Sequence, residues 1–333
     1  MSKLTKSRKD DHIRICLEKS VEFVKSNGFG HMELEHKALP EIDKDEIDLR
    51  TKFLGKNFDC PLFIEAITGG TKQGGKINRN LAKAAEALGI GMGVGSQRAM
   101  LEDPKLADTY KVRDVARPVF LLGNIGAAQI GQYEIERILS LVDSIKADGL
   151  AIHLNVAQEL AQQEGDKSWK GIYDNVVYLC KKAKFPVIVK ETGCGISGKL
   201  SRDLVKAGVK AIDIAGAGGT SWVKVDSYRT EEDVTHIEEW GIPTAEALRD
   251  VVKAVKVPVI ASGGIRTGVE VAKSLAMGAS LAGMALPLLK LATESWESVK
   301  EHLEKMISQL KDAMFLVGAR NLKELRKVRV IYT

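Results

Sequence analysis

Eight short apolar runs recur along the chain, and each is followed by a loop and an amphipathic stretch. Strands that are apolar on both faces are typical of parallel sheets covered by helices. Eight strand–helix units predict an α/β fold, a closed (β/α)8 TIM barrel, because an open doubly wound sheet usually has fewer strands. The predicted strands are Pro61–Ile67, Gly89–Val94, Pro118–Asn124, Gly149–Leu154, Pro186–Glu191, Ala211–Ala215, Pro258–Ser262 and Ser280–Met284.

The rest of the chain is organised around these units. We predict one domain, 1–333, with a barrel core at 61–290 and a C-terminal helix and tail at 291–333. The extension 1–60 contains a predicted helix near Asp10–Asn27. A polar insertion at 221–243 follows the sixth strand, and loops of that length are usually functional or disordered. We therefore expect a lid, with an inert insertion as the alternative.

Composition excludes several classes of protein. The net charge is +5 and aromatic residues make up 5%, which does not favour nucleic-acid binding. No run of 18 apolar residues exists to span a membrane, and the polar N-terminus lacks the apolar segment of a signal peptide. The four cysteines have no C-x-x-C spacing, which is typical of free thiols in a reducing compartment. We expect a cytoplasmic protein.

Polar residues and glycines gather where the predicted strands end, although the strand bodies are apolar. Active sites of such barrels lie at this carboxyl-terminal face. Gly263-Gly264-Ile265-Arg266 and Ala282-Gly283 follow the last two strands, where barrels commonly bind phosphate through exposed backbone N–H groups. A pair of glycines is also an ordinary strand-to-helix turn. The pattern as a whole predicts a phosphate-bearing ligand, with Thr220 adding a hydroxyl.

Lys190 ends the fifth predicted strand, where a cation suits the anionic edge of a flavin ring. A structural ion pair with Glu191 or Asp213 is the alternative. Neutral hydrogen-bonding groups on other strands, Thr68, Ser96 and Asn124, suit a ring with alternating carbonyl and N–H groups. We therefore expect FMN across the barrel mouth.

A second anion site is predicted from four basic residues, Arg8, Lys9, Arg98 and His153, which could converge on a diphosphate. Arg8 and Lys9 could instead be solvated surface charges. Glu159 could hold Mg²⁺, which typically binds one or two carboxylates together with substrate phosphates. Gln158 and Glu159 could also be a helix cap.

Six strings carry a resemblance to a known family. They are Arg8-Lys9-x-Asp11-His12, Thr68-Gly69-Gly70, Gly95-Ser96-Gln97-Arg98, His153-Leu154-Asn155-x-x-Gln158-Glu159, Gly218-Gly219-Thr220-Ser221-Trp222 and Gly263-Gly264-Ile265-Arg266. In this order they resemble the type 2 isopentenyl diphosphate isomerases, from residue 8 to about residue 287. The resemblance implies an FMN-dependent barrel, usually a tetramer or larger homo-oligomer, that interconverts isopentenyl and dimethylallyl diphosphate with Mg²⁺ and NADPH-reduced flavin.

The resemblance also implies roles for individual residues. Gln158, His153 and Lys190 would be catalytic, and Glu159 would bind the metal. Substrate would be bound by Arg8, Lys9, Ser96, Arg98, His153, Asn155 and Gln158. FMN would be bound by Ala66, Ile67, Thr68, Gly69, Ser96, Asn124, Lys190, Thr220, Gly263, Gly264, Ile265, Arg266, Ala282 and Gly283. The chain departs from the family at Asp226, where Glu is frequent, and at Ile67, where Met commonly precedes the threonine.

Two other functions fit part of the pattern. An FMN-dependent oxidoreductase of the 2-hydroxy-acid oxidase type shares the phosphate loops, but it needs a histidine base near the seventh strand, and no histidine lies between His236 and His302. A non-catalytic flavin- or phosphate-binding barrel would not need the second basic cluster and Glu159.

Overall fold

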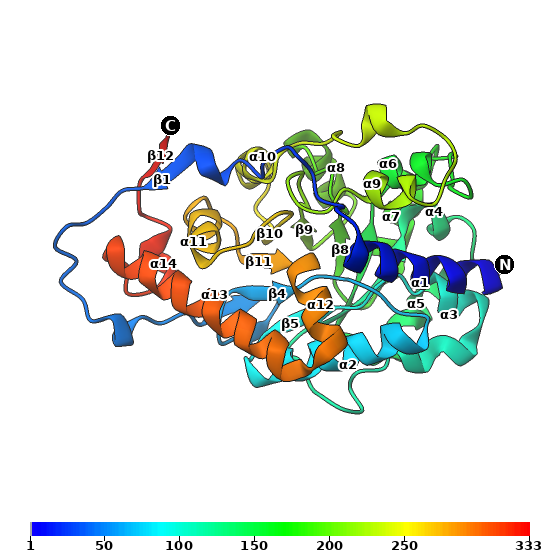
Figure 1. Ribbon diagram of the computed structural model, residues 1–333, viewed down its shortest axis with the longest axis horizontal. Coiled ribbons are helices and arrows are strands. Elements are labelled where there is room, and N and C mark those ends of the chain that lie inside the picture. The colour runs from blue at the N-terminus through cyan, green and yellow to red at the C-terminus, as the bar shows by residue number, and fades with distance from the viewer. Residues whose placement is uncertain (1) are drawn as a thin grey trace.

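The computed structural model describes residues 2–333, with side chains from Arg8 onward, and eight parallel strands in it close into a barrel (Figure 1). Seven of the predicted apolar runs contain one of these strands and the third, Pro118–Asn124, overlaps the third strand, which ends two residues later; this confirms the predicted fold. The strands are β4 (Leu62–Ile64), β5 (Gly91–Gly93), β6 (Leu121–Gly126), β7 (Gly149–His153), β8 (Val187–Lys190), β9 (Ala211–Asp213), β10 (Val259–Ser262) and β11 (Leu281–Met284).

The barrel strands are neighbours in chain order, and β11 closes the ring against β4. All barrel pairings are parallel, so the strands end at the same mouth. The register places Gly126 opposite His153, His153 opposite Lys190, and Lys190 opposite Asp213. Because paired residues of a parallel sheet point to the same face, this register brings a row of polar side chains together at the mouth.

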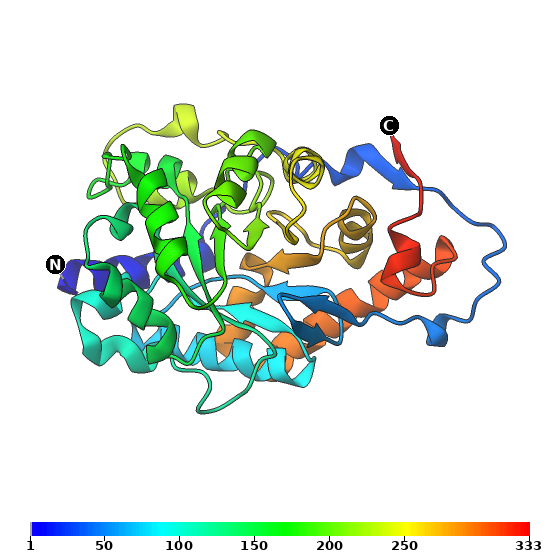
Figure 2. The same ribbon diagram turned by 180° about the vertical axis from the view of Figure 1, so that it is seen from behind.

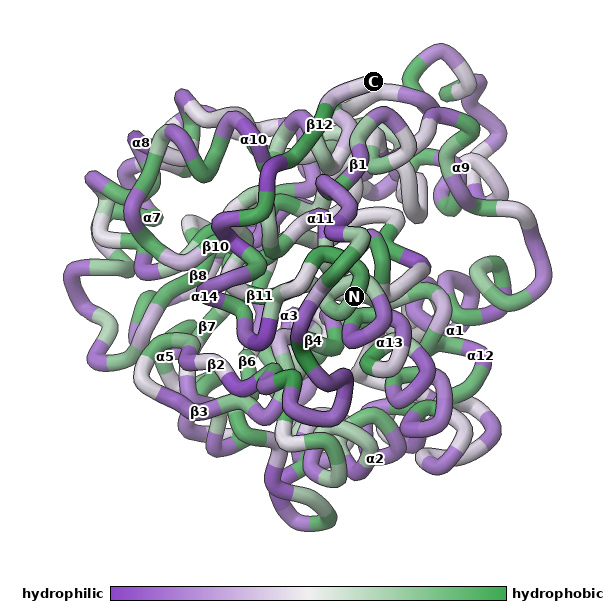
Figure 3. The backbone as a smooth tube through the Cα atoms, turned by 90° about the vertical axis from the view of Figure 1, so that its left-hand side faces the viewer, coloured by the Kyte–Doolittle hydropathy of each residue, from purple (hydrophilic) through white to green (hydrophobic). Residues whose placement is uncertain are grey.

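Helices surround the barrel, and their buried faces cover the strands (Figure 2). Figure 3 shows green and purple alternating along these helices, as expected where one face is buried. Thr71 caps α2 by accepting from Gly74 N, and Thr267 forms a capping box with Glu270 at α11. These helices are α2 (Lys72–Ala87), α3 (Arg98–Glu102), α4 (Ala127–Ile130), α5 (Ile135–Ser144), α6 (Val156–Ala161), α7 (Ile172–Lys182), α8 (Gly198–Lys206), α10 (Thr244–Ala254), α11 (Gly268–Ala276), α12 (Leu286–Glu294) and α13 (Trp296–Leu316).

The N-terminal helix differs from its prediction. Helix α1 spans Ser2–Glu18, so the predicted range Asp10–Asn27 was wrong at both ends. The chain after α1 pairs with the loop that follows β9. Glu22 forms a β-bridge with Thr220, and Phe23 N donates to Gly219 O. These backbone groups bond to a distant loop instead of forming helical hydrogen bonds. Local sequence patterns do not predict such a long-range pairing.

The remaining elements lie around the barrel. The 221–243 segment contains α9 (Trp222–Ser227), which packs against α6 and α1, and the 3₁₀ turn η4 (Thr235–Ile237). Strands β1 (Met32–Leu34) and β12 (Val330–Tyr332) pair at the end of the molecule opposite α1 (Figure 1). The other short elements are η1 (Phe29–His31), η2 (Lys44–Glu46), the hairpin β2 (Thr51–Phe53) and β3 (Lys56–Phe58), η3 (Pro104–Thr109) and α14 (Leu322–Leu325). Within residues 2–333, no helix has the length and apolar character to cross a bilayer.

Candidate active site

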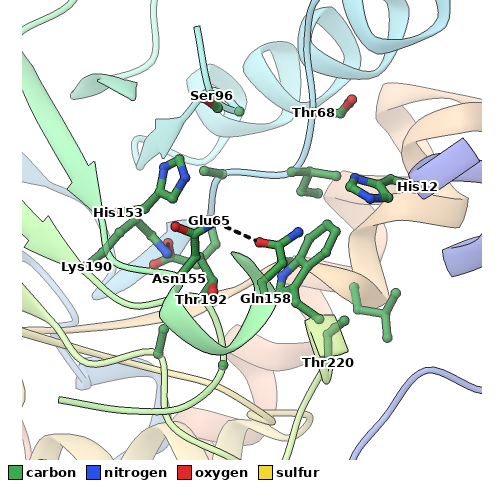
Figure 4. Close-up of a pocket in the computed structure, with 18 of the residues that line it drawn as sticks. His12, Glu65, Thr68, Ser96, His153, Asn155, Gln158, Lys190, Thr192 and Thr220 are labelled. Atoms are coloured by element: carbon green, nitrogen blue, oxygen red, sulfur yellow. Dashed lines mark hydrogen bonds and ion pairs between the residues drawn. The ribbon is translucent and has the colours of Figure 1, made fainter. Parts of the chain in front are cut away.

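A cavity opens at the carboxyl ends of the barrel strands, with α1 forming part of its wall. Figure 4 shows Glu65, His153, Asn155 and Lys190 gathered on one side of it and His12 on the other. The structure places most of the predicted site residues in this wall. They are Arg8, Lys9, Ala66, Ile67, Thr68, Ser96, Arg98, Asn124, His153, Asn155, Gln158, Glu159, Lys190, Thr220, Gly263, Gly264, Arg266 and Gly283.

Three predicted FMN residues do not line the cavity. Gly69 packs on the ring of Tyr110, where an added Cβ would lie 2.1 Å from Cε1. Ile265 is buried in the hydrophobic core. Ala282 precedes Gly283 in β11, and successive residues of a strand point to opposite faces. These three residues support the wall rather than form it.

Lys9 is held inside the cavity and is not a solvated surface charge. Its Nζ donates to Ser96 O and to the hydroxyl of Tyr110, both at 2.6 Å, and that hydroxyl donates to Ser96 O at 2.8 Å. Burial, followed by the charge of Arg8, lowers the pKa of Lys9 to about 7. Two of its three ammonium hydrogens are engaged, so one remains to bind an anion.

Arg8 connects α1 to the end of α6 and the residues that follow it at the barrel mouth. Its Nη1 donates to Gln162 Oε1 at 3.0 Å and lies 3.6 Å from Glu164, which also pairs with Arg229. Arg229 in turn contacts Asp226 at 2.8 Å. This chain of ion pairs fixes α1 against α6 and α9, with Arg8 still facing the cavity.

His153 enters the site as a neutral imidazole. Burial, with the charges of Lys190, Lys9 and Arg8, lowers its pKa to about 3. Its Nδ1 lies 2.8 Å from Asn124 Oδ1, and an amide oxygen accepts, so we assign the proton to Nδ1. The prediction counted His153 as a fourth basic group. In the structure, Arg8, Lys9 and Arg98 are the basic groups, and His153 offers Nε2 as an acceptor.

Lys190 is buried beside two carboxylates. Its Nζ lies 3.5 Å from Asp213 Oδ2 and 3.7 Å from Glu65 Oε2, and it donates to the backbone oxygen of Glu191 at 2.7 Å. The ion pair with Asp213 that the sequence left open is therefore present. The carboxylate of Glu191 accepts from backbone N–H groups of the next three residues instead. Both carboxylate distances exceed ordinary hydrogen-bond lengths, so Nζ keeps donors for a ligand.

Gln158 is oriented from two sides. Its Nε2 donates to Asp226 Oδ2 at 3.1 Å, and its Oε1 accepts from Asn155 Nδ2 at 3.2 Å, the bond drawn in Figure 4. Asp226 is fully buried and also lies 2.9 Å from His12 Nε2. Burial opposes ionisation of Asp226, but the hydrogen bonds from His12, Arg229 and Gln158 lower its pKa overall. The segment 221–243 thus builds part of the site, and its closing over substrate stays a prediction.

Glu159 is a buried carboxylate at the start of α6. Its Oε1 accepts from Asn155 Nδ2 at 3.0 Å, and its Oε2 accepts from Asp166 N at 2.7 Å. Asn155 Oδ1 is buried and has no hydrogen-bond partner in the described part of the chain. Within the described residues, no group of three or more His, Cys, Asp or Glu side chains could hold a metal ion.

The glycines of the predicted phosphate loops allow close backbone approach. At Gly263 φ is +105°, and an added Cβ would lie 2.1 Å from Gly216 O. Asn27, from the extension, donates to Gly264 O at 2.8 Å and so supports the same loop. Arg266 lines the cavity and also pairs with Glu22. The loops after β9 and β10 therefore pack backbone on backbone.

Known proteins share both the sequence and the fold. A model of the FMN-dependent dehydrogenase family matches residues 137–331. The isopentenyl-diphosphate delta-isomerase of Pyrococcus furiosus is 48% identical over 340 residues, which cover 98% of this chain and 86% of that one. Those of Methanosarcina mazei and Nostoc sp. are 46% and 44% identical, and cover 100% and 97% of this chain and 93% and 94% of their own. The chain belongs to the isopentenyl-diphosphate delta-isomerase family.

Solved structures with the same fold come from other enzymes. A putative lactate oxidase of Pediococcus acidilactici has a TM-score of 0.67 at 17% identity, over 92% of this chain and 86% of that one. A mandelate oxidase has a TM-score of 0.67 at 18% identity, over 92% and 88%. At such identities the likeness concerns the barrel alone.

The isomerase-family member has cavity residues to which the sequence interpretation assigned no role. His12 was part of a quoted string without a function. Glu65 stands between Ile64 and Ala66, and a carboxylate inside an apolar strand was a usable signal. Gln129 in α4 and Gln162 at the end of α6 carry no such local signal. The others used below are Ile13, Trp222, Ser262, Leu286 and Leu289.

Replacing Gly263 by alanine is expected to destabilise this isomerase-family barrel, because a Cβ there meets backbone at positive φ. Gly171→Ala is the matched control: φ is +84° and nothing lies within 4 Å. We expect about 1–2 kcal/mol at Gly171 and about 1–3 kcal/mol more at Gly263. Urea unfolding followed by circular dichroism measures both, and equal losses would show that the collision with Gly216 is relieved.

Proposed function

We propose that the enzyme interconverts isopentenyl and dimethylallyl diphosphate, using FMN in its reduced form, Mg²⁺, and NADPH as the source of electrons. The observation that supports this best is one cavity with cationic side chains in two regions. Arg8, Lys9 and Arg98 face it from α1 and the start of α3, and Lys190 faces it from the end of β8. Two anionic ligands can therefore share the mouth of one barrel, as an isomerase of this family with its flavin requires.

The residues present fit a flavin nucleotide. Lys190 keeps ammonium hydrogens for the ring edge, as its long carboxylate distances show, and Thr68, Ser96 and Asn124 offer hydrogen-bonding groups around it. Gly263 and Gly264 line the cavity, where their backbone N–H groups would hold the phosphate. When bound, reduced flavin supplies acid–base chemistry beside the substrate alkene, which is the hard part of this reaction.

The residues also fit Mg²⁺ brought in with the diphosphate. Glu159 supplies one buried carboxylate, and the unpartnered Asn155 Oδ1 lies in the same cluster. Oxygen donors of this kind, completed by water and substrate phosphates, are what Mg²⁺ prefers. The absence of a larger acidic cluster in residues 2–333 agrees with a metal that the protein shares with its substrate.

Substrate is oriented by the two ends of the cavity. The diphosphate binds Arg8, Lys9 and Arg98, which provides binding energy remote from the reacting carbons. The apolar wall formed by Ile13, Trp222, Leu286 and Leu289 takes the five-carbon chain. Gln158, held by Asn155 and Asp226, presents a fixed amide beside it. Asp226 is shorter than the Glu frequent at this position, yet it reaches Gln158 at 3.1 Å, so we propose that it orients Gln158.

The rival functions are less well supported. The oxidases named above share the barrel at 17–18% identity, whereas isomerases match nearly the whole chain at 44–48%. The oxidase type needs a histidine near β10, but the histidines that line the cavity are His12 of α1 and His153 of β7, and His153 is bonded to Asn124 of β6. A non-catalytic binding barrel would leave the buried Glu159 and Gln158 clusters without a purpose.

The proposal is tested by anaerobic incubation of the FMN-loaded protein with isopentenyl diphosphate, Mg²⁺ and a trace of NADPH. We expect many equivalents of dimethylallyl diphosphate for each NADPH consumed, because isomerisation has no net redox change. NADPH consumed in step with product would indicate an oxidoreductase. Flavin binding without any product would indicate a binding barrel.

Replacing Tyr110 by phenylalanine should weaken diphosphate binding, because the hydroxyl that holds Lys9 at 2.6 Å is lost. One hydrogen bond to a charged group is worth about 1.5–3 kcal/mol, so we expect KM for isopentenyl diphosphate to rise about 10- to 100-fold. The rate constant kcat should change little, since Lys9 binds the remote end. Initial rates measure the two constants, with Tyr133→Phe as the control, and a fall confined to kcat would contradict this role.

A further inference from the structure

Three ionisable side chains, Glu65, Lys190 and Asp213, form a cluster inside the barrel mouth. They come after or at the ends of β4, β8 and β9, and each is less than a tenth exposed. Lys190 Nζ lies 3.5 Å from Asp213 and 3.7 Å from Glu65, and Asp213 is within hydrogen-bonding reach of Glu65. Glu65 and Lys190 line the cavity together (Figure 4). The cluster thus holds two carboxyl groups and one ammonium.

The hydrogen bonds distinguish the two carboxyl groups. Ser262 Oγ accepts from Ala215 N at 3.1 Å, so its hydroxyl hydrogen is free to point to Asp213 Oδ1, 2.5 Å away. Asp213 therefore accepts a hydroxyl donor and lies nearer to Lys190. Glu65 Oε1 is buried and has no hydrogen-bond donor in the described part of the chain. Two neighbouring buried carboxyls do not both ionise readily, and Asp213 is the one whose charge is stabilised.

Other charged groups do not compensate a second negative charge. His153, beside Lys190 on β7, is neutral because its pKa is about 3. The carboxylate of Glu191 is turned to backbone N–H groups. Arg8 and Lys9 face the cavity from α1 and belong to the region proposed to bind the diphosphate. Burial, and then the charge of Asp213, raises the pKa of Glu65 well above its ordinary value.

We propose that Glu65 is a neutral, protonated carboxylic acid that positions Lys190 and Asp213 beside the flavin and keeps the cluster without net charge. The proposal rests on the proposed function, because it requires FMN at Lys190. The acid donates its proton to Asp213, which leaves Lys190 hydrogens directed to the flavin. Glu65 is a positioning residue, and Gly283 makes room for it, since a Cβ there would lie 2.2 Å from Glu65 Oε1.

The charge of the cluster bears on flavin reduction. Oxidised FMN that takes up two electrons and one proton gains one negative charge, so a neutral cluster favours the reduced form more than a cluster with a charge of −1. An ionised Glu65 would lower the midpoint potential of the flavin. A protonated Glu65 has no such effect, and glutamine has the same shape and charge.

The test compares Glu65→Gln with Asp213→Asn in the FMN-loaded protein by reductive titration against a reference dye. We expect Glu65→Gln to change the ratio of reduced to oxidised flavin affinity less than threefold. Asp213→Asn removes a real negative charge and should favour the reduced flavin at least tenfold, which is about 30 mV for two electrons. An upward shift in Glu65→Gln equal to that in Asp213→Asn overturns the proposal, and so does no shift in either variant.

An infrared measurement on the unaltered chain covers the case in which a variant does not fold. Burial raises the pKa of Glu191 to about 7, so Glu191→Gln is the reference: at neutral pH its holoprotein should show the C=O band of a protonated carboxylic acid, and the double variant Glu65→Gln/Glu191→Gln should lose it. A wild-type spectrum without this band overturns the proposal by itself. Wild-type protein that takes up no FMN rejects the cofactor assignment together with this role, whereas FMN-loaded protein without isomerase activity rejects the reaction alone.

Discussion

Replacing Lys190 by alanine is expected to release FMN and to lower the free energy of unfolding by about 3–5 kcal/mol, because it leaves Asp213 buried without its cation. Burial alone would lower the pKa of Lys190, but the charge of Asp213 raises it overall. A cation with a raised pKa stabilises the fold below its unfolded-state pKa. The contribution is therefore complete at neutral pH and is lost only as pH rises through the folded-state value.

Two matched variants separate the causes. Lys190→Met keeps most of the side-chain volume and removes the charge, so it should lose flavin and stability nearly as Lys190→Ala does. Lys181→Ala, at an exposed lysine of α7, should change neither. Flavin absorbance after dialysis and the urea midpoint are the measurements. A full flavin spectrum with an unchanged midpoint in Lys190→Ala would remove Lys190 from the cofactor site.

Replacing Glu159 by glutamine is expected to weaken Mg²⁺ binding by about 100-fold or more, since partners one shell further out already cost 10- to 100-fold. The fold should persist. Glutamine can still accept from Asp166 N, and the Asn155 amide can turn its unpartnered Oδ1 toward the new amide group. The effect is measured by titrating isomerase activity with Mg²⁺ at fixed isopentenyl diphosphate.

The matched control is Glu164→Gln. Glu164 follows the end of α6 and pairs with Arg8 and Arg229, but it does not line the cavity. We expect a small rise in KM from the freed Arg8 and an unchanged requirement for the metal. A Mg²⁺ titration in Glu159→Gln that overlays the wild-type curve would show that the metal is held elsewhere.

The strands were predictable because their signal is local. Val187–Lys190 and Ala211–Asp213 are apolar on both faces and end in a charged residue, so sequence alone locates both the strand and its polar end. The N-terminal helix was predicted wrongly because residues 21–23 pair with the loop after β9. That pairing depends on a segment about 200 residues away, which no local pattern contains.

The sequence identified most residues of the cavity, but it did not give their protonation states. Lys9 and His153 were both interpreted as cations from their type. Burial near other cations makes His153 neutral and brings the pKa of Lys9 to about 7. The charges that set these values, those of Arg8 and Lys190 among them, come from distant parts of the chain and act together only in the folded protein.

The sequence by itself determined the barrel, its order of strands and the residue types at its mouth. The reason is that the alternation of apolar strands and amphipathic helices is a pattern of residues close together in the chain. Tertiary structure alone decided which of those groups are charged and which meet. Glu65, Lys190 and Asp213 come from strands that are far apart in the chain, and ionisation depends on solvent exclusion and neighbouring charges, which exist only once the barrel has closed.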